Sequence, residues 1–168
     1  MEMGDHAKAS AALELLARDF PDSDASKMAL VNLGRAQMEA GNHEAAAKSF
    51  QDLMSSKADT VSVPNLSYIA DAALRLNIPN AALAACREII SRGKANHPEA
   101  GMVTGGVKDR AYVRAAEAAL KLNRLTDALN FIDTLLKDNP KTAFFFDAKF
   151  LQAQAKVKNN PPDLDGAV

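Results

Sequence analysis

Few residues of the chain have the types and spacing that chemistry requires. The segment 101–108 reads Gly-Met-Val-Thr-Gly-Gly-Val-Lys and has the glycine spacing of a phosphate-binding loop. Such a loop needs Gly-Lys-Ser/Thr after a strand, because backbone amides hold the phosphates and a hydroxyl binds Mg²⁺. Here Val107 separates the last glycine from Lys108, and Asp109 follows in place of a hydroxyl residue. We therefore reject a phosphate loop.

The histidines and the single cysteine give no sign of a metal or nucleophilic centre. His6 and His43 occupy the same place in two similar segments, and His97 stands apart from both. A metal site needs more ligands at defined spacing. Cys86 takes a position that Phe or Ile fills elsewhere, which favours a core thiol over a reactive one. The sequence thus predicts no catalytic centre, no metal site and no cofactor.

Composition excludes several other classes of protein. The chain has 168 residues, a net charge of −1, 24% charged residues and 48% hydrophobic residues. These values fit neither a strongly basic nucleic-acid binder nor a disordered chain. No apolar run approaches the roughly 18–20 residues that cross a bilayer. Alanine is frequent, and alanine suits closely packed helices because it loses no side-chain entropy there.

Similar segments recur along the sequence at intervals of 37, 36 and 46 residues. They begin at Gly4, Gly41, Asn77 and Asn123, and Asn159 is a fifth candidate start. Gly and Asn tolerate the left-handed backbone with which helices commonly end. Each copy then places one small and two apolar residues on one helix face. These residues are Ala9, Leu13 and Leu16; Ala46, Phe50 and Leu53; Ala82, Cys86 and Ile89; and Ala128, Ile132 and Leu135.

A second pattern precedes each of the later starts and indicates a seam between two helices. It combines bulky, apolar and small residues: Leu30, Leu33, Gly34 and Gln37; Leu66, Ile69, Ala70 and Ala73; Tyr112, Ala115, Ala116 and Ala119; and, more weakly, Ala148, Leu151, Gln152 and Ala155. We expect helices at 5–19, 24–40, 43–56, 64–76, 79–92, 107–122, 125–138 and 141–158. Asp22 or Ser23 is expected to cap the second helix, and Leu125 or Thr126 to begin the seventh.

Together these patterns resemble the tetratricopeptide repeat family. The best copy runs from Leu30 to Phe50, and Pro21 and Pro140 fall near repeat ends, as in the family pattern. The resemblance implies an all-α fold, an α-α superhelix (solenoid) of antiparallel helical hairpins. About three full repeats are expected, with partial repeats at both ends. We expect residues 1–168 to form one domain of this type, as a piece of a longer protein.

The resemblance also implies a protein–protein interaction scaffold that binds a protein or peptide partner and no nucleic acid. The alternative is a structural spacer or accessory region of a multidomain protein whose activity lies outside this chain. In the family, first helices line a concave face. The candidate groove residues matched to that face are Arg35, Met38, Asp71, Arg75, Arg110, Arg114 and Glu117. Further inward candidates are Met28, Val31, Glu39, Ser67, Leu74, Val113, Leu120, Lys121, Phe146 and Lys149.

One subset of the family grips the C-terminal carboxylate of its ligand with Lys, Asn and Arg residues. Arg110 and Arg114 match the basic residues of one repeat, but Val31, Arg35 and Tyr68 replace the others. We therefore do not expect that mode of binding.

Three further expectations concern irregular parts of the chain. The interval of 46 places about ten extra residues within 93–106, either as a partner contact or as a tolerated surface loop. The junction Asp19–Ser26 resembles that of bacterial envelope proteins of the family, which favours the periplasm over the cytoplasm. The partial repeats at both ends are expected to leave apolar faces through which the chain can self-associate.

Overall fold

The computed structural model describes residues 3–20, 23–94 and 96–159. Within these residues the chain is all helical, and no strand occurs in them, so the predicted all-α class is confirmed. The elements there are α1 (Met3–Asp19), α2 (Asp24–Glu39), α3 (His43–Ser56), η1 (Ala58–Thr60), α4 (Val63–Arg75), α5 (Pro79–Arg92), η2 (Ala100–Met102), α6 (Gly105–Lys121), α7 (Leu125–Asp138) and α8 (Phe145–Asn159). The two 3₁₀ turns were not predicted.

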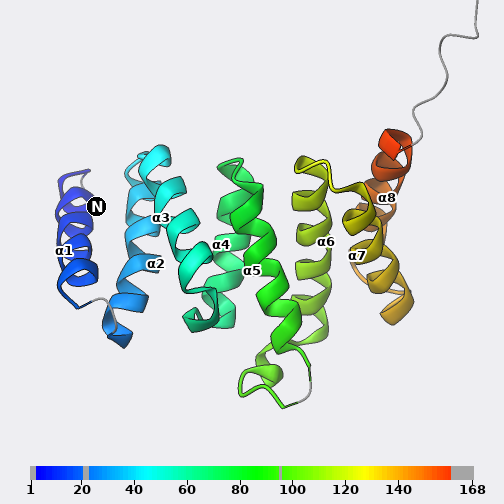
Figure 1. Cartoon of the computed structure of the whole chain (residues 1–168), viewed down its shortest axis with the longest axis horizontal. Coiled ribbons are helices and arrows are strands. Elements are labelled where there is room, and N and C mark those ends of the chain that lie inside the picture. Colours follow the sequence, from blue (N-terminus) through cyan, green and yellow to red (C-terminus); the bar gives the residue numbers. More distant parts are fainter. Residues whose placement is uncertain (1–2, 21–22, 95, 160–168) are drawn as a thin grey trace, which may run out of the picture.

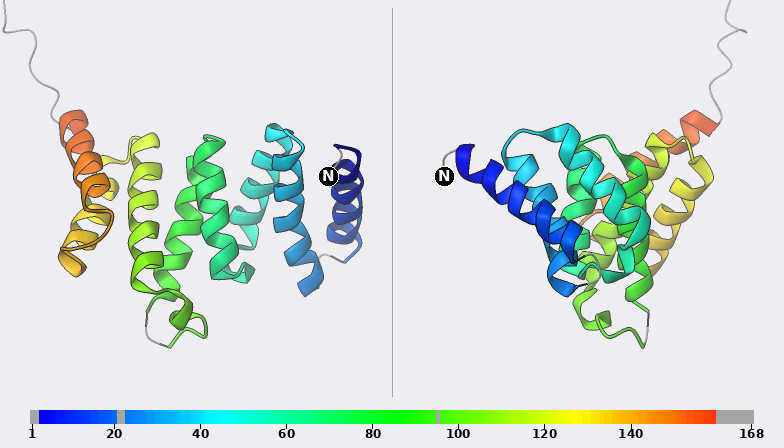
Figure 2. Two further views of the ribbon diagram at one scale, coloured as in Figure 1. Left: turned by 180° about the vertical axis from the view of Figure 1, so that it is seen from behind. Right: turned by 60° about the vertical axis from the view of Figure 1, so that its left-hand side comes forward.

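The helices form a stack of hairpins in chain order. Each helix packs on the next, and α4, α6 and α8 also contact one another in turn. Figure 1 shows the helices standing side by side from α1 to α8, and Figure 2 shows the same order from behind. In all views the connection between α5 and α6 protrudes at one edge of the stack. Contacts between neighbouring units alone are the arrangement expected of a solenoid.

Left-handed residues end three helices, as the sequence predicts. Gly41, Asn77 and Asn123 have φ values of 74°, 55° and 57°. The turn predicted at Gly4 is wrong, because α1 begins at Met3 and runs through that glycine. Asn159 is the last residue of α8, and the repeat expected to follow it lies outside the described residues.

The caps of two helices match the expected ones. Ser23 is the N-cap of α2, and its Oγ accepts a hydrogen bond from the amide of Ser26 at 3.0 Å. The other candidate, Asp22, lies outside the described residues. Helix α7 begins at Leu125, one of the two predicted positions.

Small residues let the helices approach closely at the predicted seams. Ala46, Ala82 and Ala128 are 0%, 0% and 1% exposed. Ala9, their counterpart in α1, is exposed because no first helix packs on it in the described residues. A β-carbon on Gly34 would meet the ring of Phe50, so only glycine fits there without displacing that ring.

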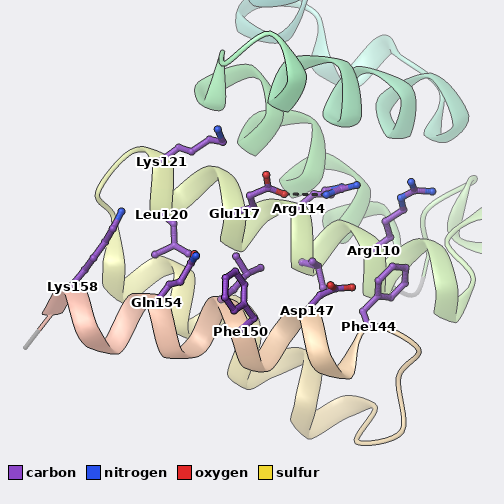
Figure 3. A pocket seen from close by; sticks show the side chains of 12 residues that line it. Arg110, Arg114, Glu117, Leu120, Lys121, Phe144, Asp147, Phe150, Gln154 and Lys158 are labelled. Carbon is purple, nitrogen blue, oxygen red and sulfur yellow. Dashed lines mark hydrogen bonds and ion pairs between the residues drawn. The ribbon is translucent and has the colours of Figure 1, made fainter.

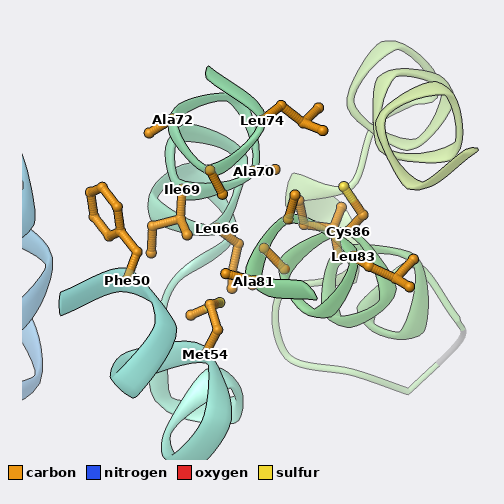
Figure 4. Packing of buried hydrophobic residues seen from close by; sticks show 14 of the residues in the cluster. Phe50, Met54, Leu66, Ile69, Ala70, Ala72, Leu74, Ala81, Leu83 and Cys86 are labelled. Carbon is orange, nitrogen blue, oxygen red and sulfur yellow. The ribbon is translucent and has the colours of Figure 1, made fainter. Parts of the chain in front are cut away.

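The wider α3–α4 junction is filled by larger side chains instead. Figure 4 shows Phe50 and Met54 of α3 pointing toward Leu66 and Ile69 of α4. All four side chains are buried in one cluster that continues into α5 and α6. A second cluster joins α6 to α7 and α8, so α6 has core on two sides. This double packing fixes the helix that carries three of the seven predicted groove residues, Arg110, Arg114 and Glu117.

The predicted start of the eighth helix at residue 141 is wrong by four residues. Thr142 Oγ1 donates to Asp109 Oδ2 at 2.7 Å and accepts a hydrogen bond from the Phe144 amide at 3.2 Å. Asn139 Nδ2 donates to the same carboxylate oxygen at 2.7 Å. These side-chain bonds compete with helix formation and hold residues 141–144 in a turn. Asp109 is only 6% exposed, so this anchor on α6 sets where α8 begins.

Candidate functional site

The structure brings most of the predicted groove residues together on the first helices. Asp71 and Arg75 lie on α4, and Arg114 and Glu117 lie on α6. With Tyr68 and Leu74, these four residues line a hollow of about 360 Å³. We call the surface formed by α2, α4, α6 and α8 the first-helix face.

Arg35 and Met38, the two predicted residues on α2, do not line this hollow. Arg35 Nη2 donates to Asn65 Oδ1 at 3.0 Å, and its guanidinium carbon lies 4.2 Å from the centre of the Tyr68 ring. Met38 is half-buried against the main core cluster. Arg35 therefore holds α2 against α4 by a hydrogen bond and a cation–π contact. Val31, a further inward candidate, is 2% exposed and belongs to the core.

The charged residues between α4 and α6 pair with one another. Arg114 Nε donates to Asp71 Oδ1 at 2.9 Å, and its Nη1 donates to Glu117 Oε2 at 3.0 Å. Arg110 Nη2 lies 3.1 Å from the second oxygen of Asp71. Partial burial lowers the pKa of Arg114, but the charges and hydrogen bonds of Asp71 and Glu117 raise it by more. Arg114 is therefore a fixed cation whose charge is balanced within the face.

A larger pocket of about 520 Å³ lies between α6 and α8 (Figure 3). It includes three predicted residues, Arg110, Arg114 and Glu117. Its other lining residues are Val113, Leu120, Lys121, Phe144, Asp147, Phe150, Leu151, Gln154 and Lys158. Gln152 Nε2 donates to Asp133 Oδ1 at 2.7 Å and so ties α8 to α7 behind the pocket.

The sequence reasoning missed several of these lining residues. It named Leu120 and Lys121 as inward, but not Phe150, Gln154 or Lys158. The repeat register carried a signal for the first of them. When Ala148 is aligned with Tyr112, Phe150 falls at the position of Arg114. Phe144 had no such signal because the turn before α8 was predicted as helix, and Asp147 aligns with Ala111, a buried residue of α6.

A third hollow of about 350 Å³ connects the other two. It lies between α4, α5 and α6 and is lined by Asp71, Arg110 and Arg114 together with buried apolar residues. Arg114 lines all three hollows, and Phe144 lines the two that adjoin the turn before α8. Three adjoining hollows that share lining residues therefore lie along the first-helix face from α4 to α8.

The insertion at 93–106 is fastened to the body of the protein. Arg92 is 3% exposed and pairs with Glu99 of the insertion and with Glu88 on its own helix, the latter at 2.8 Å. Its guanidinium also donates to the carbonyl oxygens of Ala58, Asp59 and Val61 at 3.2, 2.8 and 2.7 Å. A buried arginine thus joins the insertion to the α3–α4 connection, so the insertion is braced there.

The remaining reactive residue types form no chemical site. Cys86 is fully buried, and burial, followed by the nearby charge of Asp71, raises the pKa of its thiol far above the usual value. His43 is exposed at the start of α3. His97 Nδ1 accepts a hydrogen bond from the backbone amide of Glu99 at 3.1 Å. The side chain of His6 lies outside those described. Among the described residues, no group of three or more potential ligands gathers to hold a metal.

Comparison with known proteins relates the first part of the chain to a repeat family. A family model described as "Tetratricopeptide repeat" matches residues 1–59, which span α1, α2 and α3. Comparisons with curated proteins and with solved structures gave no significant match. None of the helices in the described part of the chain is long and apolar enough to span a bilayer.

The hairpins beyond the matched segment repeat its packing. The small residues Ala46, Ala82 and Ala128 are buried at equivalent positions in α3, α5 and α7. Repeats of this type typically mediate protein–protein interactions, and as a class they are scaffolds without catalytic residues. The chain thus contains a tetratricopeptide repeat segment, residues 1–59, of the kind that typically mediates protein interactions.

Proposed function

We propose that this chain is a protein-interaction scaffold that holds a segment of its partner along the first-helix face. The observation that carries the proposal is the row of three adjoining hollows on that face, all of them lined by Arg114. Clefts that combine apolar walls with a few placed polar groups are where proteins usually bind ligands. The predicted residues Asp71, Arg75, Arg110, Arg114 and Glu117 supply those polar groups.

The proposal includes no catalytic step. The charged side chains between α4 and α6 are arginines and carboxylates that pair with one another. Cys86 borders one hollow, but burial raises its thiol pKa and favours the protonated, unreactive form. Binding without chemistry is therefore the role that these residues suit.

Selection from a library of displayed random peptides, followed by affinity measurement, tests the scaffold role. The double variant Arg110→Glu with Arg114→Glu is expected to lower the affinity for the selected peptides at least about tenfold. Lys137→Glu with Lys141→Glu is the control, because both lysines are exposed and line none of the hollows. A structural spacer, the alternative role, predicts that no peptide is selected. Equal binding by both double variants would overturn the proposed face.

We also propose that α1 can accept the first helix of a second copy. Ala9 is exposed, whereas its counterparts Ala46, Ala82 and Ala128 are buried against a first helix. Sedimentation across a wide concentration range should show association that Ala9→Glu abolishes. Ala11→Glu is the control, because Ala11 is also exposed but lies two residues further along α1 and so on another face of the helix. A monomer at every concentration contradicts this proposal.

Two broader assignments are proposals of the same kind. Packing is continuous from α1 to α8, which supports one domain over residues 1–168. The resemblance of the Asp19–Ser26 junction supports the bacterial cell envelope as the location. Fractionation of cells that produce the protein tests the second assignment, and recovery with the cytoplasmic markers would contradict it.

A further inference from the structure

The two lysines at one end of the α6–α8 pocket have no ion-pair partner in the described part of the chain. Lys121 Nζ donates to the neutral amide oxygen of Asn77 at 3.3 Å. Lys158 makes no ion pair with any described residue. Figure 3 shows Lys121 on α6 and Lys158 on α8 at the same end of the pocket, with Gln154 beside them. Two ammonium groups at one end of a pocket make that end attractive to a carboxylate.

The other cations of the pocket are already neutralised. Arg114 is paired with Asp71 and Glu117, and Arg110 lies beside the same aspartate. Asp147, the remaining acid, lies at the opposite end of the pocket from the lysines, near Phe144 (Figure 3). The positive charge left for a ligand is therefore concentrated at the lysine end.

The middle of the pocket is apolar and open on the α8 side. Phe150 is 63% exposed, whereas Leu120 opposite it is 5% exposed. Figure 3 shows the Phe150 ring projecting from α8 into the pocket. On the same helix Phe146 and Val157 are also largely exposed. Exposed aromatic groups beside a pocket mark interaction surfaces, because their burial by a partner is favourable at roughly 25 cal/mol per Å².

We propose that this pocket binds an acidic segment of a partner protein that carries a large apolar side chain. The apolar side chain packs against Phe150 and Leu120, and a neighbouring carboxylate lies at the end of the pocket that carries Lys121 and Lys158. The inference rests on the proposed function, and it adds the chemistry of the partner and moves the binding determinants toward α8. Basic segments are disfavoured, because their positive charge would be repelled by Lys121 and Lys158, which have no ion-pair partner among the described residues.

Fluorescence anisotropy with the full chain and three labelled synthetic peptides of equal length tests the proposal. The first peptide contains Asp, Glu, Phe and Leu. The second replaces each acid by Lys, and the third keeps the acids but replaces Phe and Leu by Ser. The first peptide is expected to bind at least about tenfold more tightly than either of the others. Its affinity should fall as salt concentration rises.

Charge reversal locates the binding. The double variant Lys121→Glu with Lys158→Glu is expected to lower the affinity for the first peptide at least about tenfold. Lys137→Glu with Lys141→Glu changes the net charge equally outside the pocket and should leave the affinity within about twofold. All four lysines are exposed, so circular dichroism should show unchanged folding. Phe150→Ser, a second variant without charge change, should also weaken the first peptide.

The possible failures are distinguishable. If the basic peptide binds best and Phe150→Ser abolishes that binding, the acidic-partner inference is overturned while the proposed first-helix face stands. If the two double variants weaken the acidic peptide equally, the inference is overturned because the attraction is non-specific. If no peptide responds to any substitution on the first-helix face, both the inference and the proposed function fail.

Discussion

A β-carbon built on Gly34 would lie 2.4 Å from Cε1 of Phe50, closer than real side chains approach. The ring has little room to withdraw, because Phe50 is fully buried and its centroid lies 6.1 Å from that of Tyr68. This contact is where α2 and α3 close into a hairpin, and it makes glycine necessary at that position.

Gly34→Ala should therefore destabilise the protein despite the better helix propensity of alanine. Overpacking of a filled core costs about 1–3 kcal/mol, whereas the propensity gain is at most about 1 kcal/mol. Urea unfolding measures the difference. Gly106→Ala, a helical position with nothing within 4 Å of the added carbon, should leave stability unchanged or raise it. Equal midpoints for Gly34→Ala and the original chain would contradict the close packing.

Arg92 should matter far more for stability than a neighbouring surface arginine. Arg92→Met removes a buried cation with three carbonyl and two carboxylate partners, at a cost of about 3 kcal/mol. Arg87→Met, whose side chain is 48% exposed and paired with Asp127, should cost less than about 1 kcal/mol. Hydrogen exchange should also quicken in 57–63 and 96–103 in the Arg92 variant alone. Similar losses for the two variants would argue against the brace.

Cys86 should give the stability an alkaline dependence. Its folded pKa is raised by burial, so the stability is complete below the unfolded value of about 8.5 and falls as pH rises above it. The unfolded thiol then ionises while the buried one stays protonated. Between pH 8 and pH 10 the original chain should lose about 2 kcal/mol more than Cys86→Ala, measured by urea unfolding with reductant. Parallel pH profiles would mean that Cys86 is accessible to water in the folded state.

Asp71→Asn should separate binding from stability. The ion pairs that it breaks are partly exposed, at 30% for Asp71, 34% for Arg114 and 53% for Arg110, so unfolding should change by less than about 1 kcal/mol. Both arginines would then lose their main counter-charge beside the pocket. The affinity for an acidic aromatic peptide should rise severalfold in anisotropy measurements. Weaker binding would show that Asp71 itself contacts the ligand.

The sequence predicts the helical stack well because each repeat obeys local rules. The left-handed residues Asn77 and Asn123 follow helix ends at matched positions, and buried alanines mark seams at fixed spacing. The start of α8 escaped prediction, because Thr142 is held out of the helix by Asp109 of α6. That contact joins residues far apart in sequence, and no local pattern encodes it.

The same limit applies to the candidate site. Alignment of the first helices identifies Asp71 and Arg114 as neighbours on one face, but not that they neutralise each other at 2.9 Å. The pairing leaves Lys121 and Lys158 as the cations of the pocket without an ion-pair partner among the described residues, and this follows only from three-dimensional positions. Arg92 likewise reads as an ordinary helix-end residue, although its partners lie about thirty positions away.

The central claim is that the first-helix face receives a partner segment. Backbone amide shifts of the isotope-labelled chain, titrated with a peptide selected from the displayed library, test it directly. The account predicts the largest changes at Asp71, Arg114 and Phe150 on α4, α6 and α8, with little change at Asp52 or Asp133 on the second helices. Changes confined to α3, α5 and α7 would contradict it.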